Sequence, residues 1–306
     1  MTNFKQSASR PAALDASKER TTYAGVCHGT LGELFQGPCR GSSGELGIAV
    51  VSLPIKRYSY AHFIKGEGGA SSVPADKSKS MEIVRRYLRH HDLEMPVGRW
   101  RYASELVQGK GMASSTADLV ATIRCLDALF GLDSDAQLIA RLMRDVERSD
   151  SVFLEDVALY LSDQQELVCR FPGVPSLWAC FIDEGPVVDT HDTRTPLLRH
   201  YRREEKAYCR GLERMRGALD ACDVCAICEC ATDSARLSQR VLPKKTFPVL
   251  QSHLPQARAA GIVVAHTGSL IGYLFSDKPS AEHMGELASF FASLGHQCHF
   301  VRTGVA

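Results

Sequence analysis

The feature that most constrains this chain is a glycine-punctuated loop that runs directly into an apolar segment. Residues 109–118 are Gly-Lys-Gly-Met-Ala-Ser-Ser-Thr-Ala-Asp, and an apolar run follows as far as Phe130. The first turn of a helix carries backbone N–H groups without intrahelical partners, and the helix dipole is positive there. Small residues let the backbone close around phosphate oxygens. The loop alone therefore predicts either an anion site or an ordinary serine-capped helix, with about equal weight.

Two further segments shift this balance toward phosphate. The chain contains no Gly-x4-Gly-Lys-Ser/Thr string, and residues 109–114 lack the third glycine of a dinucleotide fingerprint. Residues 27–37, however, place the carboxylate of Glu33 inside another glycine-punctuated turn. Residues 261–272 predict a strand, a small polar turn and a second apolar strand. Three such segments, in this order and this far apart, strongly indicate a phosphate site.

The three segments resemble the ordered motifs of the GHMP small-molecule kinases. Residues 111–117 are similar to the phosphate loop of that family, Gly-Leu-Gly-Ser-Ser-Ala-Ala. Within the family, the resemblance is strongest to the L-threonine kinases of bacterial cobalamin biosynthesis. Residues 110–118 match their Lys-Gly-Met-Ala-Ser-Ser-Thr-Ala-Asp without change, and residues 32–37 match Gly-Glu-Leu-Ile-Gln-Gly with one change. Shorter matches follow at 150–153 and 242–244, so the resemblance runs from about residue 24 to the end.

The resemblance implies an α+β, two-domain GHMP kinase fold with the active site in the cleft between the domains. The expected division is a flexible tail at 1–20, an N-terminal ATP-binding domain at 21–163 and a C-terminal domain at 164–306. Residue patterns predict strands at 24–27, 48–53, 57–64, 100–107, 168–171, 177–182, 261–265, 271–275 and 297–301. They predict helices at 81–91, 115–130, 135–148, 195–220 and 280–294.

The resemblance also implies roles for individual residues. The ATP phosphates would be held by the loop, at Lys110, Gly111, Met112, Ala113, Ser114, Ser115 and Thr116. Ser115 and Glu147 would hold Mg²⁺, a hard cation that prefers oxygen ligands. Asp150 would be the catalytic residue that orients or deprotonates the acceptor hydroxyl. Without the resemblance, the charges at 144–150 would be interpreted as a solvated helix end.

The acceptor would be bound by the other two segments. Glu33 is the best candidate for its ammonium or hydroxyl group. Backbone donors of the small turn, at Thr267, Gly268 and Ser269, would close over its carboxylate or over the γ-phosphate. The neighbouring His266 either contacts phosphate or caps the strand end.

The implied reaction is ATP-dependent phosphorylation of the side-chain hydroxyl of L-threonine, giving O-phospho-L-threonine for cobalamin biosynthesis. One alternative keeps the kinase but changes the acceptor to serine, homoserine or another small hydroxylated acid. It is motivated by the weak match at 45–105 and by the changed spacing from Asp150 to Phe153. A second alternative is a non-catalytic nucleotide-binding regulator on the same fold. ATP and Mg²⁺ are the expected cofactors.

Composition agrees with a cytoplasmic enzyme of small molecules. The 36 basic and 35 acidic side chains give a net charge of +1, which argues against a nucleic-acid partner. No apolar run reaches the roughly 18 residues of a membrane span, so no membrane partner is expected. The expected partners are ATP and an amino acid, and the sequence leaves a homodimer open.

The chain has eleven cysteines, an odd number that favours a reducing compartment over a disulfide framework. Four of them have a spacing that resembles a metal-ligand run, namely Cys222, Cys225, Cys228 and Cys230. Because residues 210–239 are rich in helix formers, packing of the thiols along one helix is the favoured interpretation. Whether this cluster binds metal is not fixed by the sequence.

Overall fold

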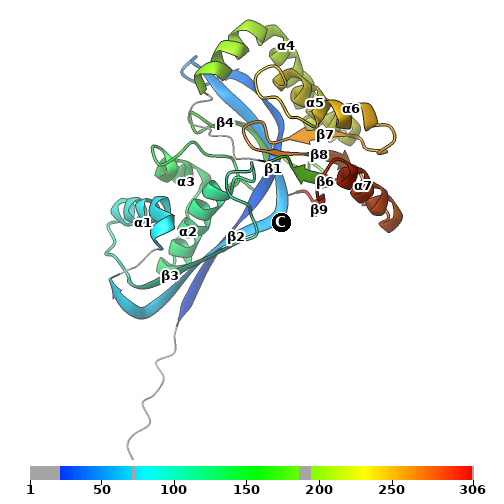
Figure 1. Cartoon of the computed structure of the whole chain (residues 1–306). Coiled ribbons are helices and arrows are strands. Elements are labelled where there is room, and N and C mark those ends of the chain that lie inside the picture. The colour runs from blue at the N-terminus through cyan, green and yellow to red at the C-terminus, as the bar shows by residue number, and fades with distance from the viewer. Residues whose placement is uncertain (1–20, 71–73, 186–193, 305–306) are drawn as a thin grey trace, which may run out of the picture.

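The computed structural model describes residues 21–70, 74–185 and 194–304, and side chains within these ranges except at 67–70. The expected tail at 1–20 lies outside the described residues. Within them, nine strands form one antiparallel sheet in the order β5-β4-β2-β1-β7-β8-β6-β9, with β3 also paired to β2 (Figure 1). The expected α+β class is confirmed.

The elements have the following bounds. The strands are β1 Thr22–Arg40, β2 Leu46–Ala70, β3 Val97–Ser104, β4 Val157–Leu161, β5 Glu166–Phe171, β6 Trp178–Asp183, β7 Gly261–Val264, β8 Leu270–Phe275 and β9 His299–Arg302. The helices are α1 Ser78–His91, α2 Ser114–Phe130, α3 Ala136–Met143, α4 Arg194–Asp220, α5 Val224–Ser238, α6 Phe247–His253 and α7 Ala281–Ser293, with a 3₁₀ turn at Ala75–Lys77.

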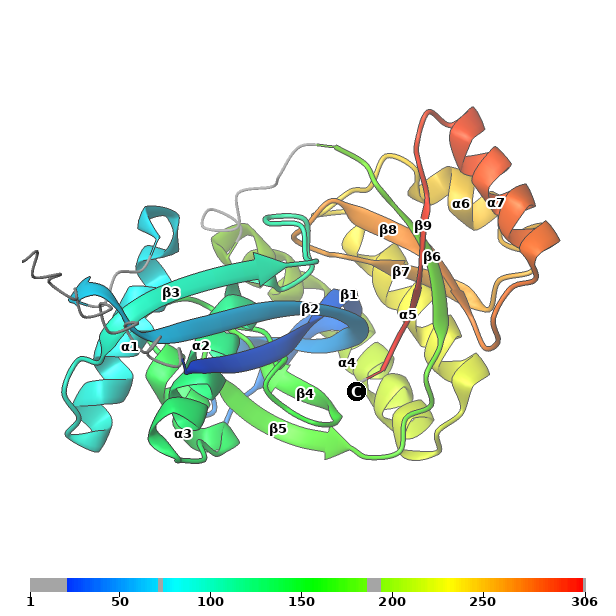
Figure 2. The same ribbon diagram turned by 90° about the horizontal axis from the view of Figure 1, so that it is seen from below.

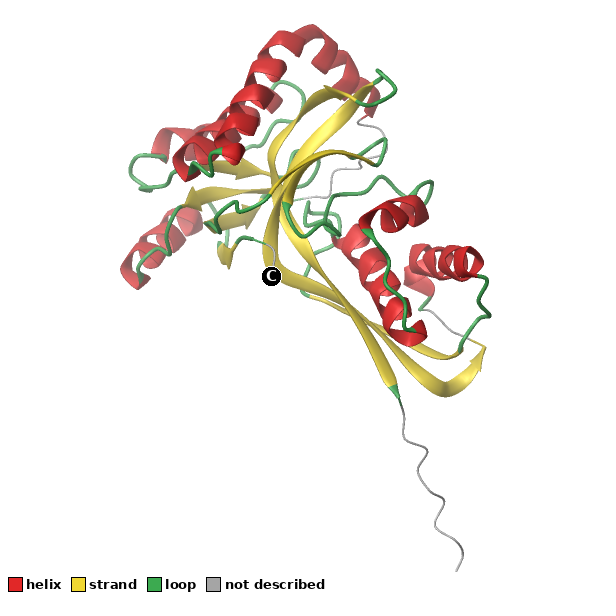
Figure 3. Ribbon diagram, turned by 180° about the vertical axis from the view of Figure 1, so that it is seen from behind, coloured by secondary structure: helices red, strands yellow, loops and turns green. Residues whose placement is uncertain are grey.

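The long hairpin of β1 and β2 runs through the whole molecule and connects two groups of helices. Helices α1, α2 and α3 gather at the end of the sheet that holds β3. Helices α5, α6 and α7 gather around β6 to β9, and α4 packs against α5 and β1 (Figures 1 and 2). The same division is visible from behind in Figure 3. Register shifts interrupt the β1–β2 pairing between His28 and Phe35, near the middle of the hairpin. The sequence segment that contains Glu33 therefore lies where the two halves meet.

Close packing of α2 on β1 fixes the position of the loop that precedes the helix. An added Cβ at Gly25 of β1 would lie 2.1 Å from the Ala121 carbonyl oxygen of α2, so the helix backbone sits directly on the strand. Most residues of α2 are buried, as its apolar sequence predicts. The helix ends at Phe130, as predicted, and Gly131 follows it with a left-handed φ of +67°.

Four predicted elements need correction. The glycine-punctuated turn expected at 27–37 lies within strand β1, whose pairing with β2 is only shifted in register there. The helix expected at 135–148 ends at Met143, because Arg144 is extended and Asp145 is left-handed with φ +67°. The helix expected across the cysteine cluster is broken, and Cys222 lies in the break with φ +52°. The strand expected at 100–107 ends at Ser104.

Two elements were not predicted. Every residue of β4 is buried, so it lacks the alternation that identifies a half-exposed strand. The seven residues of α6 are too few to show a helical period.

The expected domain boundary falls within the turn that joins β4 to β5. These strands pair as a hairpin, with Leu161 opposite Glu166. The division into domains at 163 and 164 stays a prediction. No helix in the described part of the chain is long and apolar enough to cross a membrane.

Candidate active site

The three glycine-containing segments meet through direct backbone hydrogen bonds. The Thr30 N–H donates to the Met112 carbonyl oxygen and the Gly32 N–H to that of Gly111, each at 3.1 Å. From the other side, the Ser269 N–H donates to the Lys110 carbonyl oxygen at 3.0 Å. The structure thus brings together the three segments that the sequence singled out.

Two glycines make this contact sterically feasible. An added Cβ at Gly111, whose φ is +97°, would lie 2.2 Å from the Ala265 Cβ. An added Cβ at Gly268 would lie 2.2 Å from the Lys110 carbonyl oxygen. Real Cβ atoms do not approach other atoms this closely, so any larger residue would separate the loop from the turn at 265–269.

The first turn of α2 carries no side-chain cap. Its N-cap residue, Ala113, has a left-handed φ of +53° and offers no hydrogen-bonding group to the N–H groups that follow. A left-handed alanine is strained, and such strain is typical of ligand-binding turns. Met112, by contrast, is a core side chain that is 1% exposed, so it can offer a ligand only its backbone.

Glu147 lies against the first turn of α2 although it follows α3 by several residues. The Ser115 hydroxyl donates to its Oε2 at 2.5 Å, and the Thr116 hydroxyl donates to its Oε1 at 2.9 Å. The Lys79 ammonium also pairs with Oε2, at 2.7 Å. A carboxylate that is only 8% exposed is therefore held beside the loop by two hydroxyls and one cation.

Asp150 lies in a different environment, close to Glu33. The Ser52 hydroxyl donates to Asp150 Oδ1 at 3.3 Å, and Ser52 is the β2 residue directly opposite Glu33 on β1. Burial and the negative charge of Glu33 raise the pKa of Asp150 to about 6, although Arg148 and the Ser52 hydrogen bond oppose the shift. A carboxylate with this pKa can accept a proton near neutral pH.

Glu33 is bound on one of its oxygens by His266. The backbone N–H and the Nδ1 of His266 both contact Glu33 Oε2 at 2.9 Å. The other imidazole nitrogen, Nε2, lies 3.4 Å from the Ser234 hydroxyl. The sequence left open whether His266 contacts phosphate or caps the strand end. In the structure its contacts orient the Glu33 carboxylate. Glu33 Oε1 makes no hydrogen bond to another described residue and remains available to a ligand.

The side chains of Lys110, Ser269 and Thr267 differ in whether other residues already bind them. The Lys110 ammonium pairs with Asp183 Oδ2 at 3.0 Å, and the Ser269 hydroxyl donates to Asp183 Oδ1 at 2.5 Å. Burial raises the pKa of Asp183, but the hydrogen bonds from Ser269 and Lys110 outweigh it and lower the pKa overall. Among the described residues, the hydroxyl of Thr267 has no partner. Thr267 is thus the most accessible side-chain donor of its turn.

Sequence reasoning assigned no role to several residues that the fold brings here. Ser52 and Lys79 lie in the weakly matching region 45–105, where no motif identified them. Lys244 belongs to the quoted Leu-Pro-Lys match, and it proves to be buried with its ammonium against the carbonyl oxygens of His266 and Gly268. That match was the only signal that could have identified it.

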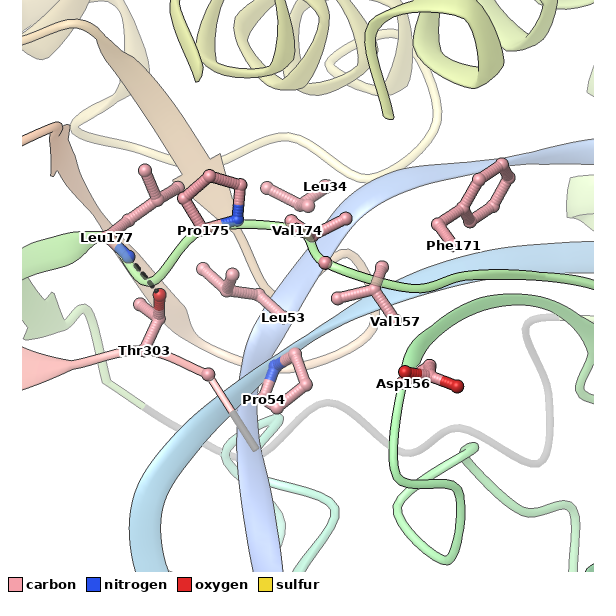
Figure 4. A pocket seen from close by; sticks show the side chains of 12 residues that line it. Leu34, Leu53, Pro54, Asp156, Val157, Phe171, Val174, Pro175, Leu177 and Thr303 are labelled. Atoms are coloured by element: carbon pink, nitrogen blue, oxygen red, sulfur yellow. Dashed lines mark hydrogen bonds between the residues drawn. The ribbon is translucent and has the colours of Figure 1, made fainter. Parts of the chain in front are cut away.

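Neither the cysteine cluster nor the small cavity next to β1 and β2 includes the residues described above. Cys225 is exposed, whereas Cys228 and Cys230 are buried. Within 21–70, 74–185 and 194–304, no group of three or more His, Cys, Asp or Glu side chains is arranged to hold a metal ion. A cavity of about 50 Å³ is lined mainly by apolar side chains, among them Leu34 and Leu53 (Figure 4). It lacks the paired acids, hydroxyls and cations described above.

Comparisons with known proteins agree with this arrangement. Residues 79–160 match the family described as GHMP kinases N terminal domain. The chain is 28% identical over 261 residues to an L-threonine kinase of Citrobacter freundii, covering 81% of this chain and 84% of that protein. It is 27% identical over 272 residues to an L-threonine kinase of Salmonella typhimurium, covering 82% of each. A homoserine kinase from Cytophaga hutchinsonii has a similar fold, with a TM-score of 0.68 at 15% identity, over 95% of this chain and 97% of that one.

In sequence the chain is thus similar to L-threonine kinases, in part of its N-terminal half it matches the GHMP kinase family, and in fold it is similar to a GHMP-type homoserine kinase. These similarities point to a kinase as the class of protein to be considered for this chain.

Proposed function

We propose that the protein transfers the γ-phosphate of ATP to the side-chain hydroxyl of L-threonine, giving O-phospho-L-threonine. The observation that carries this proposal is the position of Asp150. A partly buried base with a pKa of about 6 lies beside Glu33, and only two residues separate it from Glu147, the carboxylate bound to the phosphate loop. Nucleotide phosphates and an acceptor hydroxyl could thus be held on either side of one short segment.

The nucleotide side would be formed by the loop and the start of α2. Uncapped N–H groups of the first turn would contact the phosphates, with Lys110, Gly111, Met112, Ala113, Ser114, Ser115 and Thr116 around them. Phosphoryl transfer depends mainly on positioning and on neutralising charge, so these fixed donors are the main contribution of the protein here.

The oxygens around Glu147 fit a Mg²⁺ ion. A carboxylate and a hydroxyl, from Glu147 and Ser115, are the hard ligands that this ion accepts, and it usually completes its shell with water and substrate phosphates. When bound, Mg²⁺ would neutralise charge on the phosphates during transfer. The two hydroxyls that already bond to Glu147 fix the carboxylate in place beside the loop.

On the acceptor side, Asp150 would accept the proton of the threonine hydroxyl as its oxygen attacks the γ-phosphate. Glu33, with Oε1 free, would bind the substrate ammonium, and His266 would keep it oriented. The turn at Thr267, Gly268 and Ser269 would close over the other end of the substrate. Threonine is favoured over other acceptors because both curated relatives are L-threonine kinases, and a role in cobalamin synthesis is proposed on the same basis.

A second candidate acceptor is L-homoserine. It is favoured by the fold shared with a homoserine kinase and by the weak motif match at 45–105, which includes the acceptor-side residue Ser52. The non-catalytic regulator is disfavoured because Ser115, Glu147 and Asp150 are present together and arranged around the loop.

ADP release from MgATP would test the proposal across L-threonine, D-threonine, L-serine, L-homoserine and no acceptor. We expect stimulation by L-threonine above all others. Stimulation by L-homoserine alone would replace the acceptor but keep the kinase. ATP binding without turnover on any acceptor would favour the regulator.

A further inference from the structure

Lys244 is a buried cation that the proposed chemistry leaves unexplained. It follows α5 by six residues and is only 6% exposed. Lysine is rarely buried to this degree unless an acidic group pairs with it, because removing an ammonium from water is costly. A buried lysine therefore raises the question of where its counter-ion lies.

The contacts of the Lys244 ammonium are to backbone carbonyl oxygens. Nζ donates to the His266 carbonyl at 3.4 Å and to the Gly268 carbonyl. An ammonium has three N–H donors, so these bonds leave one donor unused. In the part of the chain that the structure describes, Lys244 forms no ion pair. The two acids that act on it from nearby are engaged elsewhere, Glu184 by the backbone of Lys245 and Glu33 by His266.

The position of Lys244 connects it to the acceptor side. Lys244 binds the carbonyl of His266, while Glu33 binds the N–H and the imidazole of the same residue. The charge of Glu33 acts on both Lys244 and Asp150. Burial lowers the pKa of Lys244, and Glu184 and Glu33 only partly oppose this shift. A bound anion would supply the missing charge.

We propose that Lys244 binds the carboxylate of the acceptor. This inference rests on the proposed function, and it identifies the acceptor as an amino acid zwitterion. Glu33 then recognises the ammonium, Lys244 the carboxylate and Asp150 the hydroxyl. Glu33 and Lys244 both bond to the turn at 266–268, so the groups that bind the two charges of the substrate are positioned by one backbone segment.

The test compares L-threonine with L-threoninol, which lacks the carboxylate, in the wild type and in Lys244→Met. Wild-type enzyme should prefer L-threonine, and Lys244→Met should raise the KM for L-threonine roughly 10- to 100-fold while leaving threoninol nearly unchanged. Lys244→Arg should recover part of the loss. The exposed neighbour provides a matched control, since Lys245→Met should behave as the wild type. A thermal melt and the affinity for an ATP analogue show whether each variant is folded.

The outcomes separate this inference from the proposed function. Loss of the preference for L-threonine over threoninol in Lys244→Met, with ATP-analogue affinity unchanged, supports it. An unchanged preference overturns it, and so does weaker ATP-analogue binding without a change in preference, because Lys244 would then serve the phosphates. If the wild type phosphorylates another carboxylated acceptor, the same comparison is made between that acceptor and its analogue with the carboxylate reduced to a hydroxymethyl group. An acceptor without an acidic group overturns the Lys244 inference and leaves the kinase intact.

Discussion

The nucleotide side and the acceptor side of this site are built in different ways. On the proposed nucleotide side, most of the predicted residues lie in one run, 110–116, and backbone groups of a helix start would do the binding. On the acceptor side, side chains from β1, β2, the segment after α3 and the turn after β7 converge. The difference is clearest in two carboxylates three residues apart. Glu147 is paired with a lysine and two hydroxyls, whereas Asp150 lies beside another carboxylate.

This contrast shows how one short segment can serve two chemical tasks. A carboxylate paired with cations and hydroxyls stays ionised and suits a metal ion. A carboxylate that is buried next to like charge has a raised pKa and suits proton transfer. The early end of α3 at Met143 leaves both residues on an irregular segment, where they need not share one helix face.

The largest effect expected is on the acceptor side. Asp150→Asn should lower kcat by roughly 10²- to 10⁴-fold, because the side chain can no longer accept the hydroxyl proton. The affinity for an ATP analogue should stay unchanged, since the loop is untouched. Steady-state kinetics and fluorescence binding measure the two quantities. Asp156→Asn, on the same irregular segment, is the control and should retain activity. Full turnover by Asp150→Asn would remove the contrast between the two carboxylates.

Substitution on the nucleotide side should instead change the metal requirement. Glu147→Gln should raise the Mg²⁺ concentration needed for half-maximal activity roughly tenfold or more, because an anionic ligand is lost. Titration of activity with Mg²⁺ at saturating ATP and acceptor gives this value, and equilibrium ATP binding with and without Mg²⁺ checks it independently. The exposed Glu155, changed to Gln, should leave the titration unmoved. A metal requirement equal to that of the wild type would argue against Glu147 as a ligand.

The contact between the two sides can be broken at Gly268. Gly268→Ala should destabilise the protein by roughly 1–3 kcal/mol, because the new Cβ would overlap the Lys110 carbonyl oxygen. Denaturant unfolding measures this loss. Gly285→Ala in α7 meets no atom within 4 Å and should be neutral or slightly stabilising. Equal stability of the two variants would mean that the loop and the turn are not tightly packed.

A smaller effect concerns stability against pH. The pKa of Asp150 is raised from 3.8 to about 6 in the folded protein, so the native state holds the proton more tightly than the unfolded chain. Asp150 therefore favours folding at low pH, and this contribution is lost as the pH rises through 6. Asp150→Asn should raise the Tm relative to the wild type at pH 7.5 and have little effect near pH 4. A Tm difference that does not change with pH would indicate an ordinary pKa.

Sequence patterns predicted the nucleotide side more completely than the acceptor side. The loop, α2 and its end at Gly131 follow from local rules of helix starts and ends, which act within a few residues. Glu33 was noted from its glycine-punctuated segment, but its role and the choice of Asp150 came only from the family resemblance, and nothing local reveals that Ser52 lies between them. The roles of Lys79 and Lys244 could not be predicted locally, because they follow from contacts with residues far away in the sequence. β4 was missed because a fully buried strand does not alternate.

The most direct test of the account is to identify the phosphorylated product. Purified protein would be incubated with MgATP and L-threonine, and the products followed by ³¹P NMR and mass spectrometry. The account predicts O-phospho-L-threonine in amounts equal to ADP, and neither product accumulating without L-threonine. ADP formed with inorganic phosphate and no phosphothreonine, or no ADP at all, would contradict it.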